Sequence, residues 1–108
     1  MQVINLCQHE VVVLDKDEKT VINRYPASGQ VARLSPKTVL LRLLPDGTPM
    51  TTTEFGEVED LPAENVTKLL IVSRVLFDRF PERNDLTYPN ELVRDEKGNV
   101  IGCRSLGC

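Results

Sequence analysis

The chain has 108 residues, with 13 Lys or Arg, 16 Asp or Glu and a formal net charge of −3 at pH 7. This length predicts a single domain over residues 1–108, and its 41% hydrophobic and 27% charged residues exclude a disordered or fibrous protein. A dedicated nucleic-acid binder normally carries a strongly basic domain, so the acidic balance argues against long nucleic acids as partners.

The first half of the chain predicts strands. β-Branched residues favour strands at 11–14 and 20–24, and the polar residues 15–19 between them suit a hairpin loop. Pro26 and Gly29 then predict a turn over residues 25–30. Pro and Gly residues also frame the apolar runs that follow and favour strands over helices there. The further extended segments that we expect are 31–34, 38–44, 49–54 and 56–59.

The second half predicts one short helix that directly follows a buried strand. Residues 68–72 form a continuous apolar run, which is typical of a strand covered on both faces. Ser73 suits a helix N-cap, and Pro81 ends the helical segment. Leu76, Phe77 and Phe80 share one face of that segment at helical spacing.

The C-terminal region predicts a loop over residues 82–90 and then a second hairpin. Its strands are expected at 92–94 and 100–104, around a polar turn at 95–99. The whole pattern predicts an α+β fold, which is a mostly antiparallel β-sheet with hairpins and one short α-helix after a buried strand.

The N-terminal residues and the cysteines indicate the compartment. No basic segment precedes a long apolar one at the N-terminus, so we expect no signal peptide and a cytoplasmic protein. The longest mainly apolar stretch, residues 68–77, is too short to cross a bilayer, so we expect no membrane partner.

The chain contains one histidine and three cysteines, which are Cys7, Cys103 and Cys108. Their spacing matches no zinc motif, so we expect reduced thiols, no metal site and no cofactor. The alternative is a metal or nucleophile site that combines Cys7, His9 and Cys103.

Arginines supply most of the positive charge, and five of them follow residue 73, close to the predicted helix N-terminus. A helix N-terminus offers free amides and a positive dipole end, and a guanidinium holds a phosphate or carboxylate with two hydrogen bonds. We therefore predict a small-anion site formed by Ser73 with one or two of Arg83, Arg94 and Arg104. In the alternative, these arginines form ion pairs with acidic residues such as Asp85.

A second candidate site is the segment from Pro26 to Arg33. The turn at Ser28 and Gly29 can present backbone amides to an anion, and Arg33 follows a few residues later. The segment lacks the glycine spacing of nucleotide-binding motifs, so an ordinary turn before a strand is the alternative.

The third candidate is the polar segment between Pro81 and Pro89, because long loops on a rigid scaffold often carry function. Asp85 could act there as a base or accept a hydrogen bond from a ribose hydroxyl. In the alternative, Asn84 and Asp85 only satisfy a turn through their side chains.

Seven short blocks carry a resemblance that covers nearly the whole chain. They are Asn5-Leu6 with His9, Pro26-x-Ser28-Gly29-x-Val31-Ala32-Arg33, Gly56-Glu57-Val58 with Leu61-Pro62, Ile71-Val72-Ser73, Arg83-x-Asp85-Leu86 with Pro89, Val93-Arg94-Asp95, and Ile101-Gly102-Cys103-Arg104. In these blocks the chain resembles a family of small uncharacterised bacterial and bacteriophage proteins that has no established activity. The family pattern commonly has Thr-Pro where this chain has Cys7-Gln8. The resemblance implies a phage or prophage setting, a host cytoplasm, and binding of a host molecule.

Three hypotheses of function follow. The leading one is a non-enzymatic protein that holds a small anionic, nucleotide-like ligand and, by analogy with a phage setting, sequesters a host signalling molecule. The first alternative is a protein-interaction or structural component that forms a homo-oligomer through exposed sheet edges. The second alternative is a small nucleotide hydrolase or transferase that uses His9 or Asp85, although no common catalytic motif is present.

Overall fold

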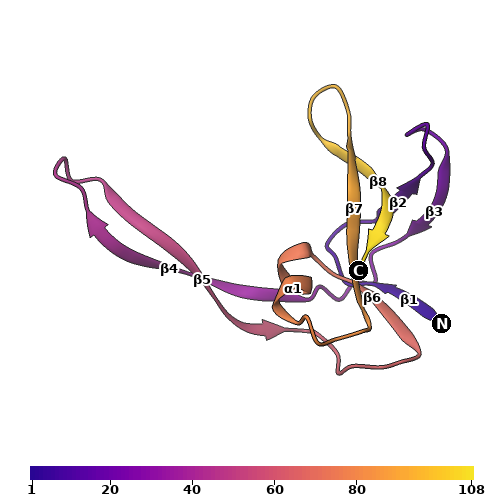
Figure 1. The fold of residues 1–108 in the computed structure, drawn as a ribbon, viewed down its shortest axis with the longest axis horizontal. Helices are drawn as coiled ribbons and strands as arrows, with labels where there is room; N and C mark the ends of the chain where they lie inside the picture. Colours follow the sequence, from indigo (N-terminus) through magenta and orange to yellow (C-terminus); the bar gives the residue numbers. More distant parts are fainter.

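The computed structural model describes residues 1–108 and is mostly β-structure with one short helix (Figure 1). In chain order the elements are β1 (Gln2–Asn5), β2 (Val11–Leu14), β3 (Val21–Tyr25), β4 (Arg33–Leu43), β5 (Pro49–Glu59), β6 (Lys68–Ile71), α1 (Arg74–Arg79), β7 (Leu86–Arg94) and β8 (Val100–Gly107). No helix has the length and apolar character that crossing a membrane requires.

Six strands form the main sheet in the order β1-β6-β7-β8-β2-β3, and β4 and β5 form a separate two-stranded sheet. The pairs β1–β6, β6–β7 and β2–β8 are parallel, whereas β7–β8 and β2–β3 are antiparallel hairpins. The main sheet is therefore mixed, and the expectation of a mostly antiparallel sheet is wrong for it. Turn residues in the sequence indicate only which consecutive strands form hairpins. The parallel pairs join segments that are far apart in sequence, and no turn indicates them.

Most of the predicted elements are confirmed, with shifted ends. The N-terminal hairpin, the strand from Lys68, the helix and the C-terminal hairpin are all present. Ser73 is the N-cap of α1, and its side chain accepts a hydrogen bond from the Leu76 amide, as its position before the apolar stripe predicted.

The prediction of a loop over residues 82–90 is wrong from Leu86 onward. β7 begins at Leu86, pairs with β6 through Leu86 and Thr87, and then pairs with β8 from Tyr88 to Arg94. The polar residues and Pro89 of this segment favoured a loop in the sequence. A proline has no backbone N–H to donate to a neighbouring strand, so it argues against a central strand. β1, which pairs with β6 at one edge of the main sheet, lies outside the predicted strands.

The core lies on both faces of β6 and the residue after it, where Leu70, Ile71 and Val72 are at most 2% exposed. Leu70 and Val72 pack with Leu76 of α1, and Ile71 packs on the opposite face with Val11 and Cys103. This alternation follows from the two-residue period of a strand. Because both faces of the strand are covered, its residues are apolar in an unbroken run and do not alternate with polar ones.

The β4–β5 hairpin leaves the body as a long arm (Figure 1). No residue of either strand is buried, and the arm joins the body only at its root, where Val58 packs against the main core. The arm contributes to a radius of gyration of 17.0 Å, whereas a compact chain of this length has about 13 Å. The molecule therefore presents two distinct parts, a small packed body and an arm that nothing covers.

Candidate functional site

The structure joins Arg83 and Asp85 in an ion pair. Arg83 Nε donates to Asp85 Oδ1 at 2.9 Å and its Nη2 donates to Oδ2 at 2.6 Å, while the Asn65 amide donates to the same carboxylate at 3.2 Å. The two side chains are only 11% and 2% exposed. Arg83 and Asp85, which were both predicted to bind a ligand, therefore bind each other. This is the alternative in which the arginines form ion pairs with acidic residues of the chain.

Burial raises the pKa of the Asp85 carboxyl, but hydrogen bonds from Arg83 and the Asn65 amide, together with the guanidinium charge, lower it by more. The pKa of Asp85 in the folded protein is therefore below its ordinary value. A carboxylate that is held ionised in this way is a weak base, which argues against the role of Asp85 as a catalytic base.

The other predicted anion-site residues lie apart from this pair. Arg94 ends β7, and β7 is about 26 Å long at roughly 3.3 Å per residue, so Arg83 and Arg94 are at opposite ends of the strand. Arg94 Nη1 donates to the carbonyl of Gly98 in its own hairpin turn, and Arg104 pairs with Glu91 at 3.7 Å. Helix α1 has only six residues, and the Ser73 side chain already caps it.

Ser28, Gly29 and Arg33 lie in a third place, at the root of the arm. The Ser28 amide donates to the Asn5 carbonyl, the Ser28 hydroxyl donates to the Gln30 carbonyl, and Gly29 has a φ of 93° that suits glycine. None of the three principal cavities is lined by more than one of the eight predicted residues. An anion site at any of these places stays a prediction that the geometry does not support.

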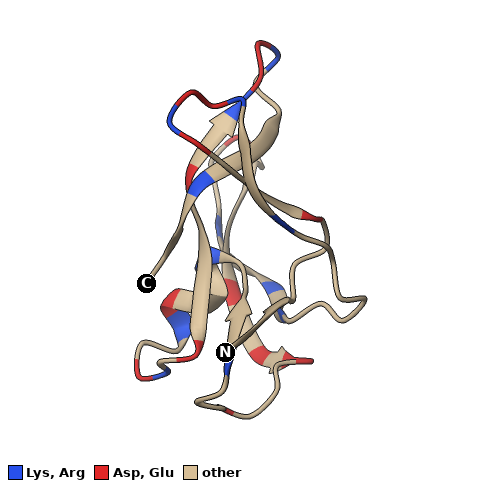
Figure 2. Cartoon of the chain, turned by 90° about the vertical axis from the view of Figure 1, so that its right-hand side faces the viewer, with Lys and Arg blue, Asp and Glu red and all other residues tan.

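Charged residues concentrate in the hairpin loops of the body rather than in a basic patch. Figure 2 shows Lys and Arg mixed with Asp and Glu in two loops at the upper end of the view. These are the turns at residues 15–19 and 95–99, each of which holds both signs. Mixed charge of this kind provides no track for a polyanion.

The feature that the sequence analysis missed is a groove in the body, and the buried side chain of Asn5 shapes its rim. Asn5 Nδ2 donates to the carbonyls of His9 at 2.8 Å and Tyr25 at 2.9 Å, and its Oδ1 accepts from the Cys7 amide at 2.8 Å. Every polar atom of this 2% exposed side chain is therefore satisfied. The bonds hold residues 6–10, the loop before β2, against the end of β1 and β3.

The groove lies between that loop, β2, β7 and β8, and has a volume of about 320 Å³. β2 and β8 pair in parallel at a single position, Val13 with Cys103. Gly102 allows the two strands to approach closely, because a Cβ there would lie 2.9 Å from the Val12 carbonyl oxygen. Apolar side chains make most of the wall, and the polar ones come from residues 7–10.

Cys7, His9 and Cys103 all line this groove, as the alternative cysteine and histidine site required. They nevertheless do not form a group of His, Cys, Asp or Glu side chains that could hold a metal ion. Burial raises the pKa of the Cys7 thiol and of the Cys103 thiol, and each sulfur points to a backbone carbonyl, of Ile71 and Val12 respectively. Both thiols are therefore uncharged at neutral pH and poorly suited to nucleophilic attack.

The arm is the second exposed feature, and its register separates an apolar face from a polar one. Residues opposite each other in an antiparallel pair share a face, and successive residues of a strand alternate. The apolar arm face comprises Pro49, Thr51, Thr53 and Phe55 of β5 with their partners Leu43, Leu40, Thr38 and Pro36 of β4. The opposite face carries the pairs Lys37 with Glu54 and Arg42 with Met50.

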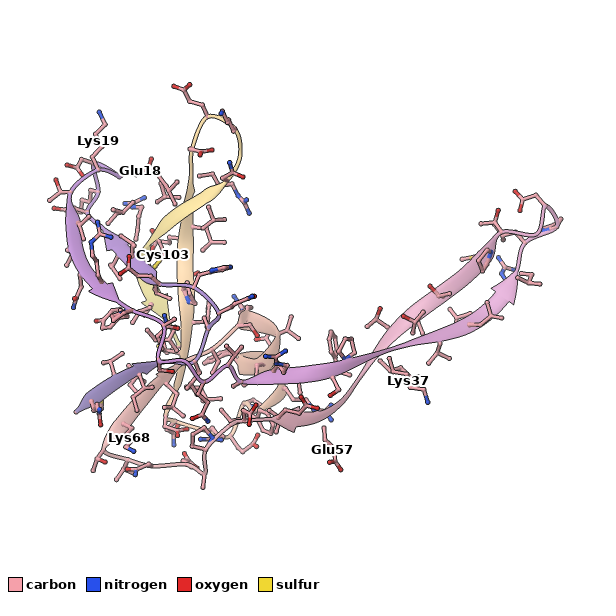
Figure 3. All side chains as sticks on the ribbon, turned by 180° about the vertical axis from the view of Figure 1, so that it is seen from behind. Glu18, Lys19, Lys37, Glu57, Lys68 and Cys103 are labelled. Atoms are coloured by element: carbon pink, nitrogen blue, oxygen red, sulfur yellow. The ribbon has the colours of Figure 1, made fainter.

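The apolar arm face is uncovered. Leu40, Leu43 and Phe55 are 57%, 62% and 44% exposed, and Leu41, in the bulge beside Leu40, is 62% exposed. Figure 3 shows the Lys37 side chain projecting away from the arm, far from the body that contains Cys103. An exposed, charge-free face of this length is rare on a protein that acts as a monomer.

Comparisons of the chain with family models, with curated proteins and with solved structures gave no match. The candidate functions therefore rest on the geometry of the groove and of the arm.

Proposed function

We propose that this chain is a non-catalytic interaction protein that forms a homodimer by packing the apolar arm faces of two copies against each other. The observation that carries the proposal is the arm itself, which projects two 11-residue strands from the body with no buried residue. An isolated two-stranded hairpin is only marginally stable in water, so a partner is needed to keep it folded.

A second copy fits this face better than a charged partner does. The face carries three threonines and two prolines beside Leu40, Leu43 and Phe55 but no charged side chain, so a two-fold axis brings apolar groups together without opposing like charges. The pairs of Lys37 with Glu54 and of Arg42 with Met50 then stay on the outer, solvated face. Aligned packing of two sheets supplies the known geometry for such a contact.

The dimensions of the molecule indicate how two copies meet. Eleven residues per strand give an arm about 33 Å long, and two such faces bury on the order of 1,000 Å² in total, which is the lower end of specific interfaces. The body is much wider than a two-stranded ribbon, so arms that run side by side in the same direction would bring the bodies into collision. We therefore place the bodies at opposite ends of the paired arms.

The test measures the mass of the assembly by native mass spectrometry and light scattering. The unmodified chain is expected at twice the chain mass, and the double variant Leu40→Ser with Leu43→Ser at the chain mass, with the body amide spectrum unchanged. Met50→Ser is the matched control, since Met50 is an exposed apolar residue on the other face of the same arm. Its dimer should persist.

Hydrogen exchange of the arm amides provides a second measurement. Arm amides should exchange slowly in the unmodified chain and in Met50→Ser but rapidly in the double variant. A monomer at micromolar concentration, or an unchanged mass for the double variant, would refute the proposal.

A further inference from the structure

We infer that the groove beside β2 and β8 is a binding site for a small, uncharged molecule with a flat ring. The site lies within one chain and does not depend on the proposed dimer. Its volume of about 320 Å³ falls at the lower end of ligand pockets, which suits one or two fused rings.

The walls of the groove set the apolar character of the ligand. Leu92, Val100 and Ile101 line it while being 50%, 49% and 47% exposed, so each has apolar surface that a ligand can cover. Val11 and Val12 of β2 also line it. β-Branched side chains on two strands form stiff, flat walls, and a planar ring makes more contact with such walls than a flexible chain does.

The charges of the groove exclude an anion. No lysine or arginine lines it, and its one formally charged residue, Glu10, accepts a hydrogen bond from Arg24 at 2.9 Å. The thiols of Cys7 and Cys103 remain protonated. An anionic group in the groove would meet apolar walls and a carboxylate, and the nearby Arg24 is already paired with that carboxylate, so the anion would find no free cation, which is costly.

Polar groups at one end give the ligand an orientation. Gln8 and His9 are exposed at the loop end of the groove, and Asn5 holds the backbone between them and β2. A ring with a nitrogen or carbonyl on its edge can hydrogen-bond to these side chains while its faces contact the apolar walls. A heterocycle of nucleobase or indole size combines both properties.

The test follows backbone amide shifts during titration with indole, a neutral planar probe, and with phenyl phosphate, an anionic ring of similar size. Indole is expected to shift the amides of residues 8–12 and 100–103, and phenyl phosphate to leave them in place. Ile101→Glu should weaken indole binding at least tenfold. Ile22→Glu is the control, because Ile22 is 60% exposed on β3 and does not line the groove.

Three results would overturn the inference. They are the absence of indole shifts in these segments, equal binding of phenyl phosphate, and dissociation of the assembly by Ile101→Glu in the absence of any probe binding. The last result would make the groove a protein interface. Repeating the titration with Leu40→Ser/Leu43→Ser separates the two proposals, because indole should bind equally well whether or not the arms pair.

Discussion

The side chain of Asn5 donates a hydrogen bond to the backbone carbonyl of His9 at 2.8 Å. This bond, with a second one to the Tyr25 carbonyl, ties the loop before β2 to the end of β1 and to β3. Asn5 and His9 are four residues apart in the chain, and this bond closes the loop between them. The asparagine side chain spans a tight loop, and His9 contributes its carbonyl to that contact.

Replacing Asn5 with Asp should therefore destabilise the body. A carboxylate cannot donate to the carbonyls of His9 and Tyr25, and a buried charge without a partner adds to the cost, so we expect a loss of about 2–4 kcal/mol. Urea unfolding measures this change. Asn23→Asp, at an exposed position on β3, should cost less than about 0.5 kcal/mol, and equal losses for both variants would contradict the role assigned to Asn5.

Breaking the buried ion pair should be costly as well. Arg83→Ala leaves the Asp85 carboxylate buried without its guanidinium, and we expect a loss of about 3–5 kcal/mol. Arg24→Ala is the control, since the exposed pair of Arg24 with Glu10 should contribute at most about 1 kcal/mol. Thermal unfolding at pH 7 distinguishes the two variants.

The same pair makes stability depend on acid. Because the pKa of Asp85 is lower in the folded than in the unfolded chain, its contribution is fully present above the ordinary carboxyl pKa of about 3.9. It is lost as the pH falls from there through the folded-state pKa. Stability measured from pH 5 downward should thus fall more steeply for the unmodified chain than for Asp85→Asn. Parallel curves would show that Asp85 is not held ionised by folding.

Glu18 offers a stabilising substitution. It has a φ of 61° in the first hairpin turn, a conformation that costs a residue with a Cβ about 1 kcal/mol and costs glycine little. Glu18→Gly should therefore raise the free energy of unfolding by about 0.5–1 kcal/mol. Lys16→Gly, in the same exposed turn but without a positive φ, should bring no gain. A denaturation midpoint that does not rise for Glu18→Gly would contradict the strained geometry.

The predicted binding residues illustrate where inference from sequence stops. Arg83, Arg94 and Arg104 are close in sequence, but an extended strand separates Arg83 from Arg94. Arg83 and Arg94 each bind a partner within their own loop or turn, and Arg104 pairs with Glu91 of the neighbouring strand. The groove, in contrast, joins residues 7–12 with residues 89–103. No local pattern in the sequence indicates that these two segments are neighbours. Only the alternative site that combines Cys7, His9 and Cys103 placed residues of both segments together.

Features that depend on neighbours in the chain follow from the sequence alone. These are the two body hairpins, the short helix with its Ser73 cap, and the buried run that follows Lys68, because turn chemistry, capping and apolar periodicity are local. The tertiary structure decided the parallel pairs of the main sheet, the ion pair that occupies Asp85, the groove, and the detachment of the arm. Each of these depends on which distant surfaces meet or fail to meet, and that outcome is set by packing of the whole chain rather than by any one segment.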